Sequence, residues 1–79
     1  MNSTTPRMYP VPSNSVDAIG YDPWTQELHV RSRGNETVYV YFDVKLEIYE
    51  SLLAADSIDA FINQQIKPRY LTSRLSDVA

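Results

Sequence analysis

The sequence contains no cysteine and only two glycines among its 79 residues. The absence of cysteine excludes disulfide bonds, thiolate metal sites and catalysis by a cysteine nucleophile. Neither Gly20 nor Gly34 opens a helical pattern, so the chain has no glycine-rich phosphate loop. At this length a single hydrophobic core supplies at most about 3–5 kcal/mol of net stability. Stability must therefore come from packing, helped by self-association.

Long hydrophobic runs and an excess of basic charge are also missing. No apolar stretch approaches the roughly 18–20 residues that span a bilayer, and residues 1–12 lack the apolar segment of a signal peptide. We therefore expect a cytoplasmic protein with no membrane association. Seven basic and ten acidic residues give a net charge of −3. This balance disfavours a non-specific nucleic-acid binder, because such proteins carry a net basic face.

Three segments have the composition of β-strands. The strongest covers residues 37–42, where β-branched and aromatic side chains follow one another without a breaker. Earlier strands are predicted over residues 13–21 and 27–33, and Gly20 within the first indicates a bulge or a close backbone approach. The dipeptide Gly34-Asn35 predicts a tight hairpin between the last two strands, because both residues tolerate positive φ.

Two helical patterns follow the strands. Asp43 is predicted to cap a first helix that ends near Ala55, and Asp56 or Ser57 to cap a second helix that Pro68 terminates. The apolar stripes at helical spacing are Ile48, Tyr49, Leu52 and Leu53 in the first helix, and Ile58, Phe61, Ile62 and Ile66 in the second.

Strands followed by helices predict an α+β fold, a three-stranded antiparallel β-meander with two C-terminal α-helices packed on one face. We expect a flexible tail over residues 1–12, a single domain over 13–75 and a frayed C-terminus over 76–79. Within the domain, residues 69–75 are predicted to be extended or irregular and to fold back on the sheet. The predicted core consists of Ile19, Leu28, Val30, Tyr49, Leu52, Leu53, Phe61, Ile62 and Ile66.

An ordered set of short motifs runs through residues 11–75. The set comprises Val11-Pro-Ser-Asn-Ser-Val16, Ile19-Gly-Tyr-Asp22, Leu28-His-Val30, Gly34, Tyr39-Val-Tyr41, Val44, Tyr49-Glu-Ser-Leu52, Ala55-Asp-Ser57, Phe61-Ile-Asn63, Ile66, Tyr70 and Leu75. It resembles the KTSC domain, a small family that takes its name from its occurrence at the C-terminus of some lysyl-tRNA-synthetase-like proteins. The family also occurs alone in bacteria and phages.

The chain departs from this family pattern at three positions. Ser32 stands where the family usually has an aromatic residue, Lys45 where it has a proline, and Asp59 where it has a glycine. These differences bear on local packing and not on a known catalytic group. The resemblance implies no enzymatic chemistry, and the fusions to synthetase-like proteins associate the family with translation or nucleic acid.

The residues capable of catalysis do not form a recognised motif. The sole histidine, His29, is predicted on the outward face of the strand over residues 27–33 as a solvated side chain, and one histidine does not make a metal site. Glu47 and Glu50 share a helix face and are predicted to be solvated rather than paired for acid–base catalysis. We therefore predict no catalytic residue, no metal site and no cofactor. A small enzyme is the least favoured interpretation.

The first candidate binding site combines Arg31 and Arg33 with Tyr39 and Tyr41. The two arginines leave one side of their strand, and tyrosines on the same side would complete an aromatic and basic patch. Such a patch suits a protein surface or stacked bases. Strand alternation does not decide whether the tyrosines or the valines between them face the helices. The composition slightly favours burial of at least one tyrosine ring.

The second candidate site lies just after the second helix. Lys67, Arg69, Tyr70 and Arg74 interleave basic and aromatic side chains there. Cations at this position also complement the helix dipole, which is the structural explanation for them. The alternative is one edge of a site for an anionic partner.

These observations predict a non-enzymatic interaction module. The acidic balance favours a protein partner over nucleic acid, although a nucleic-acid-binding accessory module remains the alternative. In a phage the protein would be an accessory factor acting on host machinery in the host cytoplasm. A short chain with an exposed strand gains stability by pairing, so we also expect a homodimer or higher oligomer formed through a sheet edge or the aromatic face.

Overall fold

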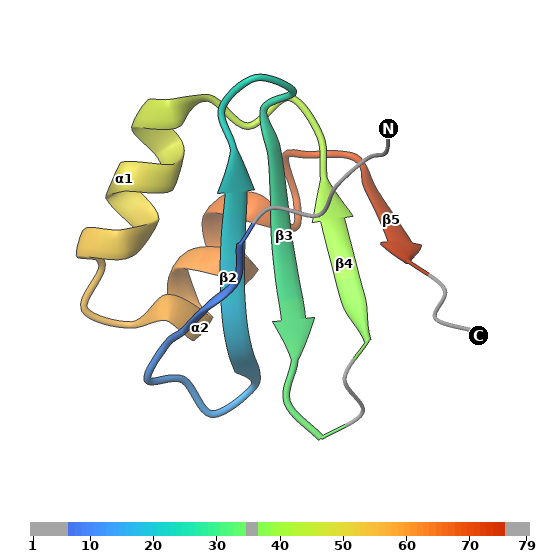
Figure 1. Ribbon diagram of the computed structural model, residues 1–79. Coiled ribbons are helices and arrows are strands. Elements are labelled where there is room, and N and C mark those ends of the chain that lie inside the picture. The colour runs from blue at the N-terminus through green and yellow to red at the C-terminus, as the bar shows by residue number, and fades with distance from the viewer. Residues whose placement is uncertain (1–6, 35–36, 76–79) are drawn as a thin grey trace.

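Five strands form one antiparallel sheet in the order β1-β2-β3-β4-β5 (Figure 1). The computed structural model describes residues 7–34 and 37–75. The strands are β1 (Tyr9–Pro10), β2 (Val16–Asp22), β3 (Glu27–Ser32), β4 (Val38–Tyr41) and β5 (Thr72–Leu75). The helices are α1 (Leu46–Ala54), α2 (Ile58–Phe61) and the π-helical turn η1 (Ile62–Ile66), and both α-helices lie on one side of the sheet.

The α+β class and the helix pair are confirmed, whereas the predicted count of three strands is wrong. The meander β2-β3-β4 is extended by a strand at each end. The N-terminal addition pairs Tyr9 with Ile19, and the C-terminal addition pairs Ser73 with Val40. The added strands are short, and their few residues carry neither strict alternation nor β-branched enrichment, so their sequences hold little strand signal.

The helix boundaries follow backbone geometry. Asp43 has φ 62°, in the left-handed region, so the predicted N-cap at this residue is wrong. Helix α1 instead begins after Lys45, which provides no side-chain cap. Of the two predicted caps of α2, Ser57 is the one that forms, because its Oγ accepts a hydrogen bond from the Ala60 N–H at 3.1 Å. The last turn before Pro68 widens, and the Lys67 N–H donates to the Ile62 carbonyl at 2.9 Å.

The core lies between the sheet and the helices. Its buried members are Val16, Ile19, Leu28, Val30, Tyr41, Val44, Leu52, Ile58, Ile62 and Ile66. The predicted core residues Ile19, Leu28, Val30, Leu52, Ile62 and Ile66 are therefore buried, and Tyr49 and Phe61 pack half-buried against them. The prediction is wrong for Leu53, whose exposed fraction is 52%. Helix α1 buries only the narrow stripe that contains Leu52.

The opposite face of the sheet is partly covered as well, which corrects the prediction for His29. This side chain is buried, with an exposed fraction of 4%. It pairs across the strands with Gly20, over which the N-terminal segment passes. A Cβ atom on Gly20 would lie 2.6 Å from the Arg7 carbonyl oxygen and 2.9 Å from Met8 Sδ. The predicted close backbone approach at Gly20 is confirmed, whereas the bulge falls between Val16 and Ala18.

Some predicted segments lie outside the described residues. They are residues 1–6 of the tail, Asn35 of the hairpin and the C-terminal residues 76–79. Gly34 has the positive φ expected at the hairpin, 102°. Among the helices of the described ranges, none is long and apolar enough to span a bilayer.

Candidate functional site

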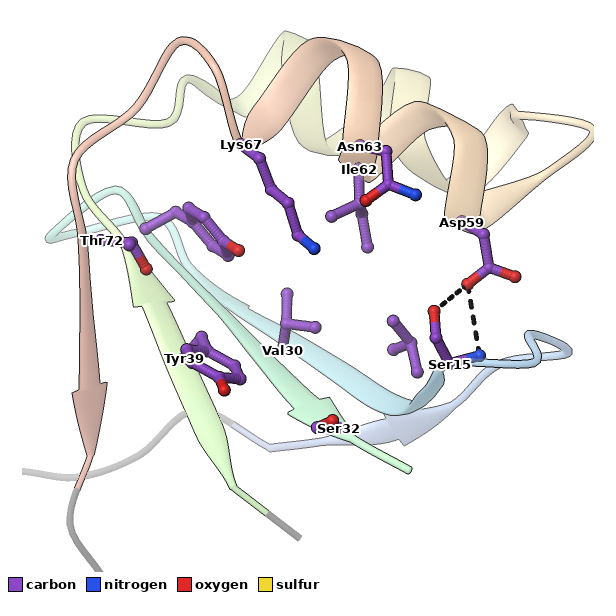
Figure 2. Close-up of a pocket in the computed structure, with 11 residues that line it drawn as sticks. Ser15, Val30, Ser32, Tyr39, Asp59, Ile62, Asn63, Lys67 and Thr72 are labelled. Carbon is purple, nitrogen blue, oxygen red and sulfur yellow. Dashed lines mark hydrogen bonds between the residues drawn. The ribbon is translucent and has the colours of Figure 1, made fainter. Parts of the chain in front are cut away.

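A cleft of about 430 Å³ opens between the sheet and the helical segment α2–η1 (Figure 2). Its apolar lining consists of Val16, Val30, Tyr41 and Ile62. Its polar lining consists of Ser15, Ser32, Tyr39, Asp59, Asn63, Lys67 and Thr72. In Figure 2 the Lys67 side chain extends from the end of η1 into the cleft, and Asp59 lies at the other end beside Ser15. An apolar base with a few convergent polar groups is the usual composition of a binding site.

Strand register explains why both tyrosines of β4 reach this cleft. Tyr39 pairs with Val30 and Tyr41 with Leu28, so the two rings share the face of the core residues. Tyr41 is buried, with an exposed fraction of 4%, and Tyr39 is half-buried. Burial raises the pKa of the Tyr41 hydroxyl above its usual value of 10.0. The expectation that at least one tyrosine ring is buried is therefore confirmed.

The predicted patch of two arginines and two tyrosines does not form. Arg31 pairs with Val38 and so faces away from Tyr39 and Tyr41. Both arginines contact Asp17 instead, with nitrogen-to-oxygen distances of 3.8 Å for Arg31 and 3.5 Å for Arg33. The prediction is wrong because Val30, and not Arg31, lies opposite Tyr39. Directly opposite residues share a face, whereas consecutive residues of one strand alternate between faces, and the sequence did not specify this register.

Arg33 has a structural role at the start of β2. Its Nε donates to the Ser13 carbonyl oxygen at 3.2 Å, and its Nη2 donates to the Val16 carbonyl oxygen at 3.3 Å. Together with the ion pair to Asp17, these bonds tie the end of β3 to the segment before the bulge. This arginine is therefore engaged within the fold.

Asp59 is held by the loop before β2. Its carboxylate accepts hydrogen bonds from the Ser13 and Ser15 hydroxyls and from the backbone N–H groups of Asn14 at 3.1 Å and Ser15 at 3.3 Å. The hydrogen bond from the Ser13 hydroxyl is the largest cause, and the bond from the Ser15 hydroxyl the next, of a lowering of the pKa of Asp59 from 3.8 to about 2. The cleft thus ends at a carboxylate that is ionised at neutral pH and already bonded.

The second predicted group is divided between the cleft and its surroundings. Lys67 lines the cleft. Arg69 is exposed in the turn that follows η1, and Tyr70 packs half-buried against the core. Arg74 pairs with Tyr39 and so lies on the cleft side of β5. The structure therefore brings together Tyr39, Tyr41 and Lys67 from the predicted sites.

Sequence inspection missed most of the polar cleft lining. Ser15, Ser32, Asn63 and Thr72 are common surface residue types from four separate segments. No spacing pattern connects them, because only the tertiary fold places them around one cavity. The sequence did carry one signal near Asp59. The run Ser13-Asn14-Ser15 is typical of a turn, and its hydroxyl and backbone N–H groups are hydrogen-bond donors that a carboxylate can accept from. In the described ranges, no three histidine or acidic side chains gather in a way that could hold a metal ion.

The fold and the cleft define a small α+β domain in which a short helical segment and an antiparallel sheet enclose an open cleft. The family model of the KTSC domain matches residues 12–70. This chain belongs to the KTSC domain family, which confirms the resemblance seen in the sequence.

Relatives and solved structures agree with this assignment. The chain is 44% identical over 63 residues to a protein from Tsukamurella paurometabola, covering 80% of this chain and 92% of the relative. It is 38% identical over 58 residues to a protein from Stutzerimonas stutzeri, covering 73% and 80% respectively. The crystal structure of a KTSC domain protein from Yersinia pestis superposes with a TM-score of 0.85 at 26% identity, covering 91% of this chain and 100% of that one.

Proposed function

We propose that this chain is a non-enzymatic interaction module that holds part of a protein partner in the cleft between the sheet and α2–η1. The observation that carries the proposal is the composition of the cleft. Val16 and Val30 from the sheet form an apolar base, Ile62 from η1 faces them, and the Lys67 side chain extends from the same helical side into the cleft. An apolar base accepts a partner side chain, and a few polar groups at the rim orient it.

The tyrosines suit a protein contact. Tyr39 presents its ring and hydroxyl to the cleft while its other side packs on the core. A half-buried tyrosine is already ordered, so a partner gains contact area at small entropy cost. Tyr41 beneath it is buried and fixes the shape of the base. This arrangement resembles the anchoring pockets around which binding energy concentrates in protein interfaces.

The carboxylate in the cleft argues against acid–base catalysis there. A catalytic acid or base works best with a pKa near the operating pH. Asp59 has a pKa lowered to about 2, and its oxygens accept bonds from Ser13 and Ser15. Its bonding supports a structural role, which is consistent with a binding module.

Nucleic acid is the second candidate partner. Lys67 and Arg74 lie on the same side as Tyr39, and basic groups beside an aromatic ring can hold a phosphate and stack a base. The net charge of −3 opposes this assignment, because the whole molecule repels a polyanion. From its size and family we further propose a cytoplasmic accessory role, directed in a phage at host machinery.

Selection from a random peptide display library tests the proposed function. The peptides enriched by the parent protein should bind Asn63→Trp about tenfold more weakly or worse, because the indole fills the cleft, whereas Gln64→Trp should bind like the parent. Both positions are exposed on η1, but only Asn63 lines the cleft. Dissociation constants measured by fluorescence anisotropy, together with unfolding curves of both variants, provide the readout.

Three outcomes would contradict this proposal. Failure to enrich any peptide would show that the partner is not a protein. Equal binding of the selected peptides by Asn63→Trp and the parent would show that the binding site lies outside the cleft. Tighter binding of single-stranded oligouridylate than of any selected peptide, with affinity that falls steeply as salt rises, would assign the cleft to nucleic acid.

A further inference from the structure

The two edges of the sheet differ in how well they are protected. Strand β1 contains only Tyr9 and Pro10, and proline removes a backbone donor. Strand β5 runs from Thr72 to Leu75 without a proline. Residues 71–74 are exposed, and Leu71 has an exposed fraction of 80%. Natural sheets usually blunt an open edge, because unpaired backbone groups recruit another strand. At the β1 edge a proline blocks the addition of another strand, whereas β5 has no proline.

The register shows which backbone groups of β5 remain available. The Phe42 N–H donates to the Leu71 carbonyl oxygen at 3.0 Å, and Val40 pairs with Ser73. Hydrogen-bonded pairs alternate along an antiparallel ladder, so Leu71 and Ser73 direct their backbone groups toward β4. Thr72 and Arg74 therefore direct an N–H and a carbonyl group outward. This alternation of donors and acceptors matches another polypeptide strand, whereas a phosphate backbone offers acceptors alone.

The same register connects this edge to the cleft. Thr72 pairs with Tyr41, and Arg74 pairs with Tyr39, so both β5 side chains lie on the cleft side of the sheet. Thr72 also lines the cleft. A strand added outside β5 would therefore run along the mouth of the cleft, and every second side chain would point toward it.

The basic residues near β5 favour one kind of partner strand over others. Lys67, Arg69 and Arg74 have no ion-pair partner among residues 7–34 and 37–75, whereas Arg31 and Arg33 contact Asp17. The edge is thus locally cationic on a protein whose net charge is −3. On β5 itself the charged residue is Arg74. A second copy of this chain would bring another Arg74 to the same edge, and like charges across paired strands are destabilising. An acidic segment would neutralise them.

We propose that β5 is a strand-addition site for an extended, acidic segment of a protein partner, which pairs with the outer edge of β5 and directs alternate side chains into the cleft. This inference rests on the proposed function and names its partner class. Strand addition supplies affinity through main-chain hydrogen bonds, and adjacent pockets supply specificity.

Two substitutions of Arg74 distinguish the contribution of its backbone N–H to peptide binding from that of its side-chain charge. Arg74→Pro removes the outward N–H and leaves the bonds to β4 in place, whereas Arg74→Gln removes only the charge. The probe is a short fluorescein-labelled peptide of alternating glutamate and valine. We expect Arg74→Gln to bind the peptide about threefold more weakly than the parent. Arg74→Pro should bind it about tenfold more weakly again than Arg74→Gln, because it also loses a main-chain hydrogen bond. A matched peptide with lysine in place of glutamate should not bind.

Each other outcome overturns a stated part of the inference. Equal binding by Arg74→Pro and Arg74→Gln would show that the β5 backbone is not used, while loss of library-selected peptides in Asn63→Trp would still uphold the proposed function. Equal binding of the lysine peptide would overturn the acidic class. A dimer by analytical ultracentrifugation that Arg74→Pro converts to a monomer would assign the edge to a second copy of this chain.

Discussion

At the scale of single residues, Asp59 joins two parts of the chain that are distant in sequence. Its carboxylate accepts bonds from Ser13, Asn14 and Ser15, which precede β2, while Asp59 itself lies in the first turn of α2. A carboxylate in the first helical turn also complements the helix dipole. The bonded loop and the helix form one end of the cleft, so this residue positions the site without needing to contact a partner.

The lowered pKa of Asp59 predicts a pH-dependent contribution to stability. Its folded-state pKa, about 2, lies below the usual 3.8, so the unfolded chain takes up the proton first as pH falls. The stabilisation is complete above about pH 4 and is lost as pH falls toward about 2. We expect Asp59→Asn to have a lower free energy of unfolding than the parent at neutral pH. This difference in free energy should decrease as the pH falls toward about 2. Urea titrations across this range measure it.

The matched control for this prediction is Asp56→Asn. Asp56 is exposed in the linker before α2, and the described part of the chain offers it no hydrogen-bond partner. Its replacement should leave the free energy of unfolding at neutral pH close to that of the parent. If both variants lose stability to the same degree at neutral pH, general charge balance and not the serine bonds explains the effect.

The local backbone conformation of single residues was predicted better than their burial. The sequence correctly indicated Gly34 at positive φ and Ser57 as a helix cap, because local backbone geometry decides both. It failed for His29, which is buried beneath the N-terminal segment. Burial of that kind depends on a contact between distant segments, and no local pattern encodes it.

At the scale of elements, the N-terminal segment passes close to the backbone of β2 at Gly20. The Arg7 carbonyl and the Met8 side chain occupy the space that a Cβ atom on Gly20 would need. Strand β1 follows directly and pairs with β2 through Tyr9 and Ile19. The segment can approach this closely only because position 20 carries no side chain.

Gly20→Ala should therefore displace residues 7–10 from the sheet. The methyl group would lie 2.6 Å from the Arg7 carbonyl oxygen, a backbone atom that cannot rotate away. We expect trypsin to cleave after Arg7 faster in this variant than in the parent. Cleavage after Arg31, within β3, serves as the internal control and should stay slow. Unchanged cleavage after Arg7 would show that the segment is not held by this contact.

The elements with a strong pattern in their own sequence could be predicted, and the two edge strands could not. Strands β3 and β4 have strong alternation, and the second helical segment has a stripe of Ile58, Ile62 and Ile66, all of which are buried. Strands β1 and β5 are formed by pairing with an existing sheet, and β5 was seen only as a segment folding back on it. Tertiary contacts decide such elements more than their own propensity does.

At the scale of the whole molecule, the cleft is a product of topology. Tyr39 comes from β4, Lys67 from the end of η1 and Thr72 from β5. The sequence identified Tyr39, Tyr41 and Lys67 as candidates through their chemistry but divided them between two sites. Only the antiparallel register and the return of the chain in β5 unite them. The predicted patch with Arg31 and Arg33 failed for the same reason, because register was unknown.

One core stabilises the entire domain, and two adjacent leucines of α1 test that description. Leu52 is fully buried, whereas Leu53 has an exposed fraction of 52%. Leu52→Ala leaves a cavity and should cost about 2–5 kcal/mol, whereas Leu53→Ala should cost about 0.5 kcal/mol or less. A single core in a chain of this length supplies only about 3–5 kcal/mol of net stability, so Leu52→Ala should be largely unfolded at 37 °C.

Thermal and urea unfolding followed by circular dichroism measure this difference directly. The two variants remove the same number of atoms from neighbouring positions of one helix, so helix propensity and composition are matched between them. The two-layer arrangement requires the loss of Leu52 to weaken the sheet together with the helix, because Leu52 belongs to the same buried cluster as Leu28 and Val30. Comparable melting of both variants would show that α1 is not docked through Leu52. Loss of helical signal before the sheet signal would show that the domain does not unfold as one unit.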